Sequence, residues 1–174
     1  MAEDKALHGD ASPPDTASAG LLDEDGLAST LNDLLEICRD GEFGFNACAQ
    51  HTRGESLRNL FRQHARACRE AADELQEQVI TRGGEPARGG STGGALHRGW
   101  VAVCGRLKGY TDQAMLDESE RGEDIAVEHY RHALGQALPD ALRALVQRQL
   151  DDAQRTHDQI KGLRDLHRQQ NPLV

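Results

Sequence analysis

The stretch TDQAMLDESERGEDIAVEHYRHALGQ, residues 111–136, repeats a pattern that occurs earlier in the chain, in residues 31–51. LLEICRDGE (Leu34 to Glu42) aligns with MLDESERGE (Met115 to Glu123), and both end in a Gly followed directly by a Glu. Each copy is followed by a similar second segment, LRNLF after the first and LRALV after the second. A helical hairpin used twice in one chain predicts an all-α four-helix bundle built from two hairpins.

Helix-start and helix-stop signals divide the rest of the chain. Ser29-Thr30 can cap the first helix, Gly83-Gly84 can stop the second, and Pro139 fits the first turn of the last. The predicted helices span about residues 29–51, 55–81, 112–136 and 139–168, with a short extra helix at about 94–107 in the crossover between the hairpins. They form one domain, residues 27–170, after a predicted disordered tail, residues 1–26, which is rich in Ala, Ser, Pro and Asp.

Charge and hydropathy exclude several kinds of partner. The formal net charge is −9, whereas binding to nucleic acid requires a basic surface, as does binding to anionic membranes. The chain has no run of about 18 apolar residues, and its first residues lack the basic start and apolar core of a signal peptide. We therefore expect a cytoplasmic protein with neither nucleic acid nor membrane among its partners.

The four cysteines, Cys38, Cys48, Cys68 and Cys104, form no CxxC pair. A chain of this length can build a core without disulfides, so we expect reduced cysteines buried on helices. A thiol-based sensor using Cys38 or Cys68 is disfavoured, because positions inside a helical core shield the sulfur.

Four titratable residues interrupt the apolar stripes of the predicted helices: Glu42, His64, Glu123 and His157. Counting residues from the turns puts all four at one height, roughly 16 Å from one end of the bundle at 1.5 Å per residue. Buried carboxylates are costly unless they are paired or bind a metal. Two inward-facing Glu and two inward-facing His can bind a divalent cation such as zinc, iron or manganese. This layer is therefore a candidate metal site.

A purely structural role for these residues is the alternative. The two histidines can be hydrogen-bonded residues at the edge of the core. The two glutamates can form ion pairs with a neighbouring arginine: Arg66, Arg69, Arg148 or Arg155. Di-iron bundles also use Glu-x-x-His motifs, and here the nearest forms are Gln154-x-x-His157 and Glu70-x-x-Asp73. The number of carboxylates is low for an oxygen-activating di-iron centre.

Four longer motifs occur along the chain: LNDLLEICRDGEFGF (Leu31 to Phe45), GALHRGW (Gly94 to Trp100), ERGEDIAVEHYRHAL (Glu120 to Leu134) and the segment from Leu138 to Asp165. Together they resemble an uncharacterised bacterial family of ferritin-like four-helix-bundle proteins, a domain of unknown function near the ferritin and rubrerythrin group. The resemblance spans about residues 27–166. It implies a ferritin-like bundle without an established activity, in which Glu42, Glu123 and His157 match the inward positions of metal ligands.

Two functions follow as hypotheses. The first is a non-catalytic bundle that acts through self-association, as a dimer, or through a protein partner, with a role in a stress response. The second is a metal-binding bundle with oxidoreductase-type chemistry, in which Glu42, Glu123 and His157 hold iron or another divalent metal and His64 assists. The missing Glu-x-x-His motifs and the acidic surface favour the first, so we do not expect an enzyme.

Overall fold

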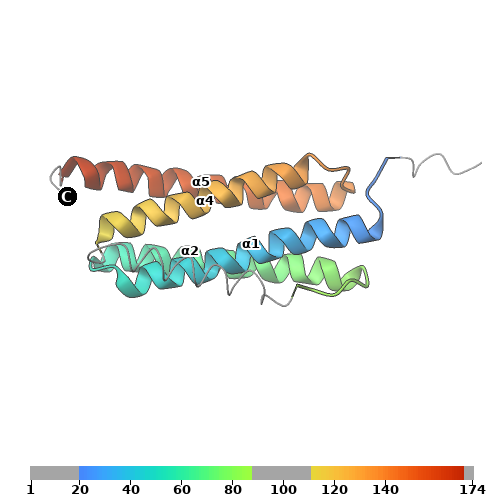
Figure 1. The fold of residues 1–174 in the computed structure, drawn as a ribbon, viewed down its shortest axis with the longest axis horizontal. Helices are drawn as coiled ribbons and strands as arrows, with labels where there is room; N and C mark the ends of the chain where they lie inside the picture. Colours follow the sequence, from blue (N-terminus) through green and yellow to red (C-terminus); the bar gives the residue numbers. More distant parts are fainter. Residues whose placement is uncertain (1–19, 88–110, 171–174) are drawn as a thin grey trace, which may run out of the picture.

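The computed structural model describes residues 20–87 and 111–170, and this part of the chain forms four α-helices and no strand (Figure 1). They are α1 (Glu24–His51), α2 (Glu55–Thr81), α4 (Asp112–Leu134) and α5 (Asp140–Gln170). Helices α1 and α2 form one antiparallel hairpin, α4 and α5 form the other, and the hairpins pack through α1 against α4. The predicted all-α bundle of two hairpins is confirmed. The predicted extra helix at 94–107 lies outside the described residues.

Helix α1 starts earlier than predicted, at Glu24 rather than near Ser29. The side chain of Asp23 caps it by accepting a hydrogen bond from the backbone N–H of Gly26 at 2.8 Å. Thr30, part of the predicted cap, lies inside the helix, where its hydroxyl donates to the Gly26 carbonyl at 2.9 Å. The helical domain therefore includes residues that we assigned to the disordered tail.

The end of α2 and the start of α4 follow local sequence signals. Helix α2 ends at Thr81, and Gly83 follows with a φ of +74°, which is accessible to glycine without a steric penalty. The N–H of Gly84 then donates to the carbonyl of Val79 at 3.0 Å, which satisfies a carbonyl at the helix end. Thr111 caps α4 by accepting from the N–H of Ala114 at 3.1 Å. Both helix ends are therefore fixed by their own sequence.

The apolar core is divided into two clusters along the bundle. One contains the fully buried Leu31 and Leu142, and the other contains the fully buried Phe61 and Ile160. Each cluster combines residues from α1, α2, α4 and α5, so both hairpins contribute at both levels. None of the helices in the two described ranges is long and apolar enough to cross a membrane.

Candidate functional site

A cavity of about 880 Å³ interrupts the core between the two apolar clusters. Small-molecule sites in proteins have volumes of this order. Its wall is built by residues 37–48 of α1, 63–74 of α2, 118–130 of α4 and 148–159 of α5. All four residues of the predicted metal layer fall within these spans, but only His64 and Glu123 line the cavity.

Glu123 is the carboxyl group at the centre of the cavity wall. It is 6% exposed, and no hydrogen bond or ion pair reaches it from the described residues. Burial raises the pKa of Glu123 from 4.5 to about 8, because the charged form loses its hydration and gains no cation in return. Near neutral pH the group is therefore mostly an uncharged carboxylic acid.

His64 contributes an imidazole to the same cavity. It is 6% exposed, and its ring lies 5.3 Å from that of Phe45, measured between centroids. Its Nδ1 atom lies 3.4 Å from the hydroxyl of Thr156, whereas its buried Nε2 atom has no hydrogen-bond partner in the described structure. Burial lowers the pKa of His64, so the ring is neutral at pH 7. Such an orphaned polar atom is unusual in a native protein.

A chain of hydrogen bonds crosses one side of the cavity and was not predicted from the sequence. The hydroxyl of Tyr130 donates to Gln149 Oε1 at 3.1 Å, and Gln149 Nε2 donates to Glu74 at 2.8 Å. The Sγ of Cys38 lies 3.0 Å from the same hydroxyl. Because the phenol gives its only proton to Gln149, Cys38 is the donor in this contact. Burial raises the pKa of Cys38 to about 11, consistent with a protonated thiol.

The thiols in the described structure are reduced, as predicted: Cys38, Cys48 and Cys68 are all free, and Cys104 lies outside the described residues. Cys48 accepts a hydrogen bond from Ser119 at 3.3 Å. Burial also raises the pKa of Cys68 well above its usual range. Cys38 and Cys68 therefore have little of the thiolate that reactive cysteines need at neutral pH.

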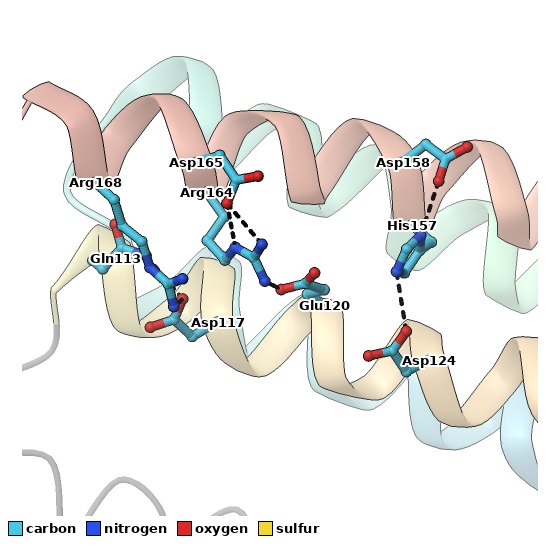
Figure 2. Close-up of polar contacts among 9 residues, drawn as sticks. All are labelled: Gln113, Asp117, Glu120, Asp124, His157, Asp158, Arg164, Asp165 and Arg168. Atoms are coloured by element: carbon cyan, nitrogen blue, oxygen red, sulfur yellow. Dashed lines mark hydrogen bonds and ion pairs between the residues drawn. The ribbon is translucent and has the colours of Figure 1, made fainter.

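Glu42 and His157 have ion-pair partners outside the cavity. Glu42 forms an ion pair with Arg69, which is one of the pairs that the structural alternative allows. The imidazole of His157 lies between two carboxylates, 3.0 Å from Asp124 and 3.0 Å from Asp158 (Figure 2). The structure therefore separates the predicted layer into two cavity residues and two residues engaged elsewhere.

The contact between α4 and α5 carries further ion pairs that the sequence analysis missed. Arg164 joins the buried Glu120 to Asp165, and Arg168 pairs with Asp117 at 2.8 Å (Figure 2). The sequence contains the pattern behind these ion pairs. The acids Asp117 and Glu120 are three residues apart on α4, and the bases Arg164 and Arg168 are four residues apart on α5, so each pair lies on one face of its helix.

The groups around the cavity do not fit a two-metal centre. Such a centre in a four-helix bundle takes a Glu from each of two helices and a Glu-x-x-His pair from each of the others. In the described ranges, no group of three or more His, Cys, Asp or Glu side chains is placed to hold a metal ion. The wall also carries Cys38, Tyr130 and Gln149, which are not ligands of such a centre.

Comparison with known protein families identifies one match. The model of a family described as a domain of unknown function (DUF2383) matches residues 27–136. None of the proteins with curated functional descriptions is significantly similar in sequence. The family match covers helices α1, α2 and α4, and so includes most of the cavity wall.

Solved structures with a similar fold share little sequence with this chain. A dodecameric thioferritin, the bacterioferritin-related protein of Bacteroides fragilis, has a TM-score of 0.71 at 16% identity, over 88% of this chain and 93% of that one. A point mutant of Mycobacterium smegmatis Dps1 has a TM-score of 0.67 at 16% identity, over 81% and 96%. A two-domain protein of Anabaena variabilis with DJ-1/ThiJ/PfpI-like and ferritin-like domains has a TM-score of 0.68 at 10% identity, over 92% and 45%. These likenesses show a shared fold.

Proposed function

Because the chain belongs to this family of unknown function (DUF2383) and has the ferritin-like fold, as its motifs indicated, we propose that it is a non-catalytic homo-oligomer that acts through contacts between its own copies. The fold is compatible with assembly, since the similar thioferritin is described as dodecameric. The non-catalytic part is supported by the described residues, among which no three His, Cys, Asp or Glu side chains are placed together as the ligands of a two-metal centre.

The observation that carries this proposal is an apolar surface across α1 and α4. Phe43 on α1 is 42% exposed and Ile125 on α4 is 41% exposed, and the two helices pack side by side. Next to them, Gly44 and Gly122 have open space where a side chain would stand. A second helix can therefore approach the backbone closely and bury both apolar side chains. We propose that this surface forms an isologous dimer contact.

The test replaces both apolar side chains, Phe43→Lys with Ile125→Lys, and measures mass by light scattering coupled to size-exclusion chromatography. The wild type is expected to be a dimer or a larger oligomer, and the double variant a monomer, because lysines cannot be buried unpaired in the contact. The matched control is Ile80→Lys with Leu166→Lys, which also replaces two exposed apolar residues but on α2 and α5. Equal masses for all three proteins would place the contact elsewhere, and a monomeric wild type would refute self-association.

Metal binding is the second candidate function, favoured by the two cavity residues without partners. A single divalent ion would be held by His64 and Glu123, since imidazole and carboxylate suit iron, zinc and manganese. Such an ion would supply Lewis-acid or redox chemistry. Glu42 and His157 would have to leave their ion pairs with Arg69 and Asp124 in order to take part. Metal analysis, described at the end of the Discussion, distinguishes the two candidates.

A further inference from the structure

The cavity wall contains more carboxyl groups than it has cations to pair with them. Each of its three arginines forms an ion pair with an acid of the same wall: Arg121 with Glu118, Arg148 with Glu74 and Arg155 with Asp152. Three further carboxyl groups of the wall, Asp40, Glu70 and Glu123, form no ion pair with any described residue. The wall therefore has three acids in excess, one at its centre and two nearer its mouths.

Two residues of the cavity wall have hydrogen-bonding atoms without partners among the described residues, namely Nε2 of His64 and the carboxyl group of Glu123. Both His64 and Glu123 are more than nine-tenths buried, and His64 Nε2 is orphaned in the described structure. Leaving such groups unpaired in the interior costs more than exposing them to water. A ligand that donates hydrogen bonds to both would remove this cost, and a cationic donor would also compensate the excess acids.

The wall also offers apolar surface, and the space is large for an ion. Phe45 lies beside the His64 ring, and Ala71, Ala126 and Ala153 add aliphatic surface from three helices. A volume of about 880 Å³ accommodates an organic molecule with a hydrophobic body. We propose that the mid-bundle cavity binds a small organic amine in its ammonium form, with the charged nitrogen at Glu123 and His64 and the apolar body against Phe45 and the alanines.

This binding mode predicts a release of protons. Glu123 is mostly protonated near pH 7, because burial without a cation raises its pKa to about 8. An ammonium group beside it lowers that pKa, so the carboxyl group gives its proton to solvent and becomes the carboxylate partner of the ligand. Each ligand bound at pH 7 should therefore release about one proton. A neutral ligand would release none.

The experiment is isothermal titration calorimetry of the full chain at pH 7 with three probes of one ring system: 1-naphthylmethylamine, 1-naphthylmethanol and 1-naphthoate. The ammonium compound is expected to bind at least about tenfold more tightly than the alcohol, because a charge-assisted hydrogen bond is stronger than a neutral one. The carboxylate is expected not to bind. Repeating the titration in buffers with different ionisation enthalpies measures the proton released.

Two variants assign the effect to the cavity. Glu123→Gln keeps the size and the neutral state of the protonated carboxyl group, so it should fold, yet it should lose both the preference for the amine and the proton release. Glu42→Gln, in the ion pair with Arg69 outside the cavity, is the matched control and should keep both. Binding of the alcohol as tightly as the amine, unchanged amine binding by Glu123→Gln, or no binding of any probe would each overturn the proposal.

Discussion

Among single residues, Glu123 should dominate the dependence of stability on pH. Its pKa is about 8 in the folded chain against 4.5 for an ordinary Glu, so between these values the folded state binds more protons than the unfolded state. The free energy of unfolding should therefore decrease as pH rises from about 4.5 to about 8, and level off above that range. The groups near it, Cys38 and Cys68 from the first hairpin and Tyr130 on α4, all have raised pKa values and stay neutral in this range.

Urea unfolding at pH 5, 6.5 and 8 tests this prediction. Relative to the wild type, Glu123→Gln should gain stability progressively, by a few kcal/mol between the extremes, because an amide does not ionise. His64 acts in the opposite direction, since its lowered pKa means that stability is lost as pH falls below 6.5. Both proteins contain His64, so subtracting one free energy of unfolding from the other at each pH removes the contribution of His64. Parallel stability profiles would show that Glu123 has an ordinary pKa.

The position of the cavity along the bundle could be predicted from single polar residues, but whether each side chain points into the core could not. On a helix, neighbouring residues point about 100° apart, so a polar residue at the edge of an apolar stripe can face the core or a neighbouring helix. Glu42 faces a neighbouring helix and forms an ion pair with Arg69 of α2, and His157 contacts Asp124 of α4 in the same way. Gln149 was not among the predicted core residues, yet it is 4% exposed.

At the scale of elements, Gly41 sets the distance between α1 and α2. The close approach of α2 accounts for a glycine at this position inside α1. A β-carbon at Gly41 would lie 3.0 Å from the Sγ of Cys68 on α2, closer than normal van der Waals contact, whereas one at Gly44 would meet no atom within 4 Å. The same substitution at two glycines of one helix should therefore have opposite effects on stability.

Gly41→Ala is expected to lower the free energy of unfolding by about 1 kcal/mol, because overpacking by roughly 1–3 kcal/mol exceeds a helix-propensity gain of roughly 1 kcal/mol. Gly44→Ala gains helix propensity without overpacking, so it should stabilise the protein by roughly 1 kcal/mol. Urea unfolding of both variants measures the difference. In a Cys68→Ala background, Gly41→Ala should become stabilising as well. A destabilising effect that persists there would place the clash on another neighbour.

The helices themselves were the most predictable feature, because their signals are local. Thr111 caps α4 and Gly83 ends α2 through contacts within a few residues of each position. The start of α1 was missed because Asp23 and Ser29 are both suitable caps in sequence, and only the packing of Leu27, which is 3% exposed, makes the longer helix favourable. Contacts between the two hairpins, such as that of Cys38 with Tyr130, depend on packing that no local pattern encodes.

At the scale of the whole molecule, the internal repeat places one hairpin against a related one and leaves a polar cavity between two apolar clusters. The cavity wall holds one buried Glu, one buried His and a set of thiol, phenol and amide groups, and no three of the described His, Cys, Asp or Glu side chains are placed to hold a metal ion. We therefore propose, as the central claim, that the cavity is not a metal centre and that the protein acts by binding, both between its copies and at the cavity.

Metal content after addition of iron(II) tests this claim most directly, on protein purified without a metal-affinity column and then desalted. We predict less than one iron per chain by mass spectrometry and no consumption of oxygen. One or two iron ions per chain, lost in the His64→Asn Glu123→Gln variant and retained in the Glu42→Gln His157→Asn variant, would contradict the claim and make the cavity a metal centre. Loss in the second variant instead would restore the layer predicted from the sequence, with Glu42 and His157 as ligands.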